Sequence, residues 1–142
     1  VLEQVRTFSA PERDPNALRL VNLRKLRSIN SWMHNVEALV RSDAPRLLIH
    51  PADAAARGLE DEASAKLATA QGSIEVVVSL TEDVRPGCVA YPHGWGNHGG
   101  WTRANGKGGG NLNAVVPRGP QSAEQLSGMS YLEGFDVEVS PA

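Results

Sequence analysis

Cysteine is almost absent from this sequence of 142 residues, and its scarcity excludes several kinds of site. The single cysteine, Cys88, cannot form an internal disulfide. Nor can one thiol supply the set of thiolates that an iron–sulfur cluster or a thiolate-based zinc site requires. Because Cys88 lies in the apolar run CVAY, we interpret it as a small buried hydrophobic side chain.

Long apolar runs and an excess of charge of one sign are missing as well. No apolar stretch approaches the roughly 20 residues of a membrane-spanning helix. The formal net charge of −2 gives no basis for bulk electrostatic binding to nucleic acid or to a membrane surface. The start of the chain carries no secretory signal. The expected location is the cytoplasm, although a piece of a longer protein need not carry the targeting signal of its parent. Because the first residue is Val1 and not Met, the chain is compatible with being a piece of a longer protein.

Aromatic residues are also few, at 5%, whereas Gly (14) and Pro (9) are numerous for this length. That balance favours short strands and turns over a helical bundle. The length fits one domain with its own core. Residues 1–17 contain the polar stretch SAPERDPN and are predicted to be a linker or extended tail. The domain is then expected to span residues 18–142.

Alternating or β-branched apolar runs predict six or seven short strands and therefore a mainly β barrel or sandwich with short helices. The expected strands are LRLVNL (18–23), RLLIH (46–50), the two halves of SAKLATAQGSIEVVVSL (64–80), CVAY (88–91), a brief LNAVV (112–116) and GFDVEV (134–139). A helix of about two turns is predicted in HPADAAARGL, where Pro51 suits the first helical position and Gly58 the residue after the end. VEALVRSD and GPQSAEQLSGM are expected to be short helical turns or loops.

Two polar loops follow expected strands and concentrate hydrogen-bonding side chains. SINSWMHN (28–35) supplies Asn, Ser, Trp and His, and YPHGWGNHGGW (91–101) adds two His, two Trp and several Gly. Asn and Ser both donate and accept, Trp offers a flat face, and Gly lets the backbone approach a ligand closely. This inventory suits a planar heterocycle. The alternative is that Asn and Ser cap a helix beginning near Val36 while Trp32 belongs to the core.

Three other kinds of site find little support. The glycine-rich stretch 94–110 is not a phosphate-binding P-loop, because Trp101 stands where the first Gly should be and Gly108 follows Lys107. A flexible loop is its simplest interpretation. The spacing of His34, His93 and His98 with Cys88 matches no standard zinc pattern. A hydrolase triad lacks the GxSxG elbow.

Five segments, taken in order, resemble one family. They are LRLVNLRKLRSINSWMHN, IHPADAAARGL, GSIEVVVSLTEDVRPGCVAYPHGWG, NLNAVV and LSGMSYLEGFDVEV, and together they cover Arg19 to Val139. They are similar to the C-terminal, molybdopterin dinucleotide-binding domain of the molybdopterin oxidoreductases, the class of formate dehydrogenases and nitrate reductases. One departure is that Glu62 and Ala63 stand where the family often has Gly-Asp in a tight turn.

The resemblance implies a double-psi β-barrel that binds molybdopterin guanine dinucleotide carrying molybdenum or tungsten. Residues of the matching motifs are expected to line the cofactor, with no protein ligand to the metal from this chain. These residues are Arg27, Asn30, Ser31, Trp32, His34 and Asn35 in the first loop, His93, Gly94 and Trp95 in the second, and Asn111 and Asn113 in the third.

The resemblance also implies what lies elsewhere. The partners would be the catalytic domains of the same parent chain or complex, which would hold any iron–sulfur cluster, and this chain alone would be inactive. Neither nucleic acid nor membrane insertion is expected. The alternative function is a stand-alone double-psi barrel that binds another nucleotide or a protein partner, because a fold does not dictate a function.

Overall fold

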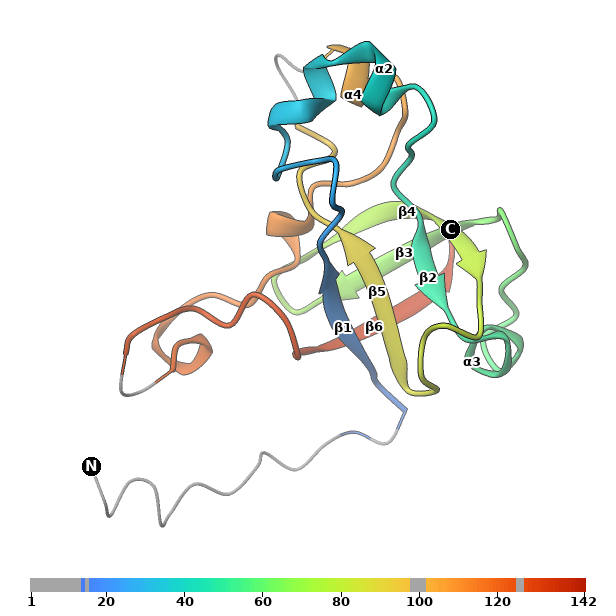
Figure 1. Ribbon diagram of the computed structural model, residues 1–142. Coiled ribbons are helices and arrows are strands. Elements are labelled where there is room, and N and C mark those ends of the chain that lie inside the picture. Colours follow the sequence, from blue (N-terminus) through green and yellow to red (C-terminus); the bar gives the residue numbers. More distant parts are fainter. Residues whose placement is uncertain (1–13, 15, 98–101, 125–126) are drawn as a thin grey trace.

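Six strands in the described part of the chain close into one barrel (Figure 1). The computed structural model describes residues 14, 16–97, 102–124 and 127–142. Most of the expected tail, residues 1–17, therefore lies outside the described residues. The strands are β1 (Leu18–Leu23), β2 (Leu47–Ile49), β3 (Ser64–Thr69), β4 (Gly72–Leu80), β5 (Cys88–Pro92) and β6 (Asp136–Pro141).

The order of the strands around the barrel is β1-β5-β2-β4-β3-β6. Strand β5 lies between β1 and β2, parallel to the first and antiparallel to the second. Strand β2 likewise lies between β4 and β5, parallel to β4. The β1–β2 and β4–β5 connections therefore each pass over the strand between them, which makes two interlocked psi motifs. The expected double-psi β-barrel with short helices is confirmed.

Alternation along the strands forms the core, as the sequence predicts. In β4, Ile74, Val76 and Val78 are buried, whereas Glu75 between them is exposed. The paired strands continue the pattern with Leu67 of β3. Each large apolar side chain that is fully buried contributes about 1.5–3 kcal/mol, so the barrel interior is the main source of stability.

The predicted helix forms as α3 (Pro51–Ala55), slightly shorter than expected. Pro51 occupies the first turn, and the His50 Nδ1 atom accepts a hydrogen bond from the Ala52 N–H at 3.2 Å. Gly58 has φ +65°, the left-handed conformation expected after the helix. The Asp53 carboxylate accepts from the Gly87 N–H at 2.7 Å, which ties α3 to the turn before β5.

The brief strand predicted over LNAVV is wrong. This segment contains the 3₁₀ helix η2 (Leu112–Ala114). The Asn111 side-chain oxygen accepts from the Asn113 N–H at 3.1 Å, and this cap favours a helical turn over an extended chain. The turn buries Leu112 and Val115, three residues apart, where a strand would have buried alternate residues. Another short turn, η3 (Pro120–Ser122), fits the helical expectation for GPQSAEQLSGM.

The turn at Glu62 keeps a glycine-like backbone without glycine. Glu62 has φ +58°, which lies in the left-handed region. Its N–H donates to the Val78 carbonyl at 3.0 Å, and its carboxylate pairs with the Arg46 guanidinium at 2.9 Å. The turn geometry is retained at the cost of backbone strain.

Short helices form a lobe beyond one end of the barrel, opposite α3 (Figure 1). They are η1 (Trp32–Asn35), α2 (Glu37–Val40) and α4 (Thr102–Asn105), and they contact one another. In the ranges that the structure describes, no helix combines the length and the apolar character needed to cross a bilayer.

Candidate functional site

The parallel pairing of β1 and β5 brings the two polar loops to the same end of the barrel. Asn22 is in register with Tyr91, and Leu23 with Pro92. Because parallel strands end at the same edge, the chain leaves both strands side by side. The loops after β1 and β5 therefore begin next to each other, although about 70 residues separate them in the sequence.

His93 joins these loops through both of its ring nitrogens. Its Nδ1 lies 2.8 Å from Asn22 Oδ1, and its Nε2 lies 2.6 Å from Asn30 Oδ1. Burial lowers the pKa of His93, and the nearby Arg24 charge lowers it further. The neutral ring carries one N–H, which donates to the side-chain oxygen of one asparagine. The other ring nitrogen can only accept, and it accepts from the NH₂ group of the second asparagine when that side-chain amide is flipped.

Gly94 packs its backbone against the first loop. It has φ +90°, and a Cβ atom there would lie 2.7 Å from the Asn30 carbonyl oxygen. The loop it touches is strained, because Ile29 and Asn30 have φ +42° and +59°. Left-handed backbone is unusual for a β-branched residue such as Ile29. The close contact with Gly94 therefore falls on the part of the first loop where the backbone is left-handed, at Ile29 and Asn30.

The side chains of His34 and Trp95 stack on each other, with ring centroids 4.0 Å apart and ring planes tilted by 34°. Their exposed fractions are only 3% and 1%. Neither ring nitrogen of His34 nor the indole Nε1 of Trp95 has a hydrogen-bond partner of normal geometry among the described residues. Burial lowers the pKa of His34 and outweighs the opposing charge of Asp43, so burial favours the neutral form of the ring.

The helix-cap alternative for the first loop is wrong. Trp32 is 74% exposed and does not belong to the core. Neither Ser31, which precedes η1, nor Val36, which precedes α2, makes a side-chain capping hydrogen bond. The Asn35 carbonyl accepts from the Arg103 guanidinium at 2.6 Å, which links the loop to α4. The polar side chains of Ser31 and Asn35 therefore have no capping role.

The third predicted segment reaches the same region through Gly96. A Cβ atom on Gly96 would lie 2.5 Å from the Asn111 backbone nitrogen, so the second loop and the Asn111 segment touch directly. The Asn111 side chain also approaches Asn97 at 3.4 Å, whereas the Asn113 side chain is exposed. Arg27 is exposed and makes no hydrogen bond or ion pair with a described residue.

Sequence reasoning missed Asn22 and Tyr91. Asn22 is polar near the end of an apolar strand, a signal that could have been read. The buried Tyr91 hydroxyl accepts from the Gly110 N–H at 2.9 Å and donates to the Gly110 carbonyl at 3.3 Å. Burial raises the pKa of Tyr91 to about 12. The end of the glycine-rich stretch is thus held by a specific contact.

Within the described residues, no group of three or more His, Cys, Asp and Glu side chains is placed to hold a metal ion. His98, which the zinc alternative needs, and Trp101 lie outside the described residues. The expectation that the chain supplies no metal ligand stays a prediction.

A family model described as "Molydopterin dinucleotide binding domain" matches residues 18–131. The chain belongs to this family. The match includes every residue that was expected to contact the cofactor, and the family resemblance inferred from the sequence is confirmed. A search of curated proteins gives no match.

Among solved structures, this molydopterin dinucleotide binding domain is similar to acetylene hydratase from Pelobacter acetylenicus. The TM-score is 0.75 at 23% sequence identity, over 88% of this chain. The chain spans only 18% of the length of that hydratase chain. At this identity the likeness supports the fold.

Proposed function

We propose that this domain binds molybdopterin guanine dinucleotide, carrying molybdenum or tungsten, as part of an oxidoreductase. The observation that supports this best is the meeting of three predicted loops at one end of the barrel. Gly94 packs on Asn30, and Gly96 packs on Asn111. Residues 18–142 form the binding domain in this proposal, and residues 1–17 form a linker or extended tail.

The donor set of the first loop fits a flat polar ligand with a pyrophosphate. Ser31 and Asn35 have hydroxyl and amide groups that can pair with the edges of a pterin or a guanine. The exposed ring of Trp32 offers a stacking face. Arg27 carries an uncommitted guanidinium for a phosphate oxygen, and Asn30 adds an amide beside His93.

The second and third loops complete the proposed site. His93 and Gly94 place a ring and a backbone close to the first loop. Asn113 is exposed, and Asn111 positions the Asn113 backbone. His34 and Trp95 are covered in this conformation, so direct contact with the cofactor requires their stack to open. Their three unpartnered ring nitrogens would gain hydrogen bonds in that event.

The chemistry of the bound group is separate from the work of this chain. When bound, the cofactor supplies redox chemistry through its metal. The residues of this chain bind and orient it, and the chain alone is inactive in this proposal. Catalytic domains of the same parent chain or complex provide the remaining contacts to the cofactor and hold any iron–sulfur cluster. The proposed location of the parent protein is the cytoplasm.

Exposed apolar side chains beside the loops support a partner domain there. Leu26 is 96% exposed, and Ile29 and Trp32 are also largely exposed. Large apolar groups gathered on one loop are a usual mark of an interaction surface. The small share of the acetylene hydratase chain that this chain spans is consistent with a larger parent protein.

NMR on the labelled 142-residue chain tests the binding site. We expect a guanine nucleotide, and then released molybdopterin cofactor, to shift resonances at 30–35, 93–95 and 111–113. Asn35→Ala should weaken binding about fivefold, because one hydrogen bond contributes about 1 kcal/mol. Asn16→Ala is the matched control, since both residues are exposed and each uses its backbone carbonyl to hold an arginine.

The same two variants test the proposal in the parent protein. Asn35→Ala should lower the content of metal and of guanine nucleotide, whereas Asn16→Ala should leave both unchanged. Equal content in both variants would instead favour the alternative, a barrel used for another nucleotide or a protein partner. We also expect the isolated chain to bind cofactor more weakly than the parent, because the ligand would be clamped between domains. Equal affinity would contradict the clamp.

A further inference from the structure

Asn22 is the next-to-last residue of β1, close to the point where the first polar loop leaves the barrel. Its backbone is fixed in the sheet, in register with Tyr91 of β5. Its side chain is half-buried, and in the described part of the chain it makes one hydrogen bond, with the His93 Nδ1 atom at 2.8 Å. Asn22 is not one of the residues assigned to contact the cofactor. Any effect of its side chain on the site therefore passes through His93.

Two successive residues of the second loop hold Asn30. The Nε2 atom of His93 lies 2.6 Å from Asn30 Oδ1. Gly94 packs against the Asn30 backbone, since a Cβ atom on Gly94 would lie 2.7 Å from the Asn30 carbonyl oxygen. Asn30 has φ +59°, a conformation that asparagine tolerates better than most residues. The backbone thus places the Asn30 side chain beside the imidazole, and the ring decides which end of the amide faces it.

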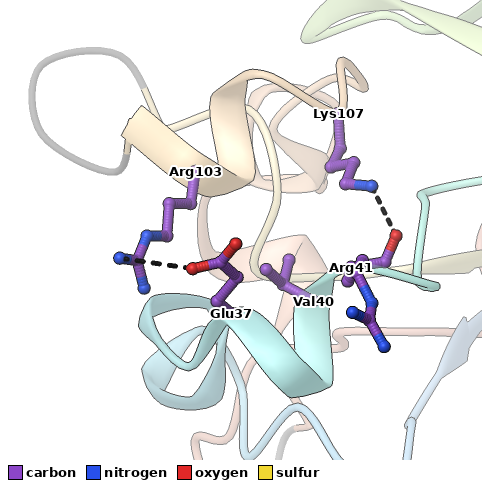
Figure 2. Close-up of a pocket in the computed structure, with 5 residues that line it drawn as sticks. All are labelled: Glu37, Val40, Arg41, Arg103 and Lys107. Atoms are coloured by element: carbon purple, nitrogen blue, oxygen red, sulfur yellow. Dashed lines mark hydrogen bonds and ion pairs between the residues drawn. The ribbon is translucent and has the colours of Figure 1, made fainter.

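The helical lobe holds the far end of the first loop. This loop ends in η1, which packs against α2 and α4. Arg103 of α4 pairs with the Glu37 carboxylate at 3.9 Å. Lys107 donates to the Arg41 carbonyl at 2.7 Å, and both contacts cross the pocket between α2 and α4 (Figure 2). Because the loop is fixed to β1 at one end and to the lobe at the other, Asn30 keeps its place while its amide turns.

The His93 ring has one proton to place between two amide oxygens. Burial and the Arg24 charge lower the pKa of His93 from 6.5, so at pH 8 the ring is neutral and carries a single N–H. One of the two amides then turns its NH₂ group toward the bare ring nitrogen. Asn22 is half-buried in a strand, whereas Asn30 is exposed on a loop, where water pairs with whichever end of the amide faces outward. Turning Asn30 costs less, so Nδ1 keeps the proton and Nε2 accepts from the Asn30 NH₂ group.

We propose that Asn22 is a positioning residue of the site: it keeps the His93 proton on Nδ1, and Asn30 therefore presents its side-chain oxygen to the ligand. Because that oxygen only accepts, the ring edge of the ligand that faces it carries an N–H donor. Guanine and pterin share such a donor, an amino group on a six-membered ring. The ligand in this inference rests on the proposed cofactor function. The positions of the proton and of the Asn30 amide are properties of the chain without ligand.

Nitrogen NMR of the ¹⁵N-labelled 142-residue chain at pH 8 tests where the proton lies, because a protonated and a bare imidazole nitrogen have well-separated shifts. We expect a protonated Nδ1 and a bare Nε2 at His93. Asn22→Ala should move the proton to Nε2, the form that free histidine prefers, so that the two shifts exchange. Asn22→Asp keeps an acceptor at that place and should retain the proton on Nδ1. Val21→Ala, which truncates the exposed neighbour in β1, is the matched control and should change neither shift.

Two pairs of ligands, each differing in one amino group, test the ring edge. Inosine diphosphate lacks the amino group of guanosine diphosphate, and lumazine has an oxygen in place of the amino group of pterin. We expect the amino member of one pair to bind about fivefold more tightly, as for one hydrogen bond. The pair that shows this preference identifies the ring beside Asn30. Asn22→Ala should abolish the preference, because Asn30 then turns its NH₂ group outward.

The inference is overturned by a proton on Nε2 in the unmodified chain, by an unchanged tautomer in Asn22→Ala, or by equal binding of both members of each pair. Binding of guanosine diphosphate with the proton on Nε2 would leave the proposed cofactor function intact. A proton that moves from Nδ1 in Asn22→Ala, with none of the four ligands bound, would support the role of Asn22 and count against the cofactor function instead. A thermal unfolding curve for each variant shows that a changed shift does not reflect a lost fold.

Discussion

The imidazole of His34 lies against the indole of Trp95, with centroids 4.0 Å apart, and this pair joins the loop after β1 to the loop after β5. Both rings are buried, and none of their three nitrogens has a hydrogen-bond partner of normal geometry in the described residues. Buried polar atoms without partners cost stability. The pair therefore lowers the stability of the region where the two loops meet.

Stability should fall as the solution is acidified. Burial lowers the pKa of His34 and of His93 from 6.5, so the unfolded chain binds protons that the folded chain does not. Between the lowered pKa values of the folded chain and 6.5, the free energy of unfolding therefore rises with pH. The contribution of the two histidines to stability is lost as the pH falls below about 6.5. Urea unfolding at pH 8, 7, 6 and 5 would measure this loss.

His34→Phe assigns the effect to one side chain. Phenylalanine keeps a flat ring beside Trp95 and removes both the titration and the unpartnered nitrogens. We expect a flatter dependence of stability on pH than in the unmodified chain, with the remaining slope due to His93. An unchanged pH profile in this variant would show that His34 does not titrate with folding.

Replacing Gly94 by alanine should destabilise the contact between the two loops. The new Cβ atom would lie 2.7 Å from the Asn30 carbonyl oxygen, and the residue would keep φ +90°. Strain of this kind costs about 1–3 kcal/mol, and the steric overlap adds to it. Chemical denaturation of Gly94→Ala would measure the sum.

Gly87→Ala separates strain from overlap. Gly87 has φ +81°, and a Cβ atom there would meet nothing within 4 Å. This variant should therefore show the backbone strain alone and lose less stability than Gly94→Ala. Equal losses would mean that the Asn30 carbonyl moves away without cost.

Strands with clear alternation were predictable from sequence, and so was the meeting of the loops once the family was recognised. β4 pairs with β3 through a short turn, and Ile74, Val76 and Val78 face the core as the pattern indicates. LNAVV misled because it ends in two β-branched valines, which favour a strand, yet the Asn111 side chain caps a 3₁₀ turn. A local side-chain hydrogen bond outweighed strand propensity there.

Contacts between distant segments could not be read in the same way. The His93 ring lies between Asn22 and Asn30, and each separation exceeds 60 residues. Only the parallel register of β1 and β5 places these side chains together. The stacking of His34 on Trp95 also depends on how the short helices of the lobe pack against one another, and no periodicity in the sequence predicts that packing.

Glycine at position 62 should stabilise the turn relative to alanine. Glu62 has φ +58°, a conformation that costs a side chain about 1–2 kcal/mol, whereas glycine adopts it freely. Both Glu62→Gly and Glu62→Ala lose the ion pair with Arg46, which is partly exposed and contributes less than about 1 kcal/mol. We expect Glu62→Gly to exceed Glu62→Ala by about 0.5–1 kcal/mol in free energy of unfolding, after the entropy of glycine in the unfolded chain is included. Alanine as the more stable of the two would contradict the left-handed turn.

Removing the hydroxyl of Tyr91 should loosen the end of the glycine-rich stretch. In Tyr91→Phe the Gly110 N–H loses its acceptor at 2.9 Å, in a region where the tyrosine is fully buried. Leaving a buried donor unpaired costs about 1–3 kcal/mol. Hydrogen exchange at the Gly110 amide should accelerate accordingly, because opening of that segment becomes easier. Tyr131→Phe is the matched control, since Tyr131 is 44% exposed and its hydroxyl makes no hydrogen bond with a described residue. Acceleration at Gly110 in both variants would show that the Tyr91 hydroxyl does not hold this segment.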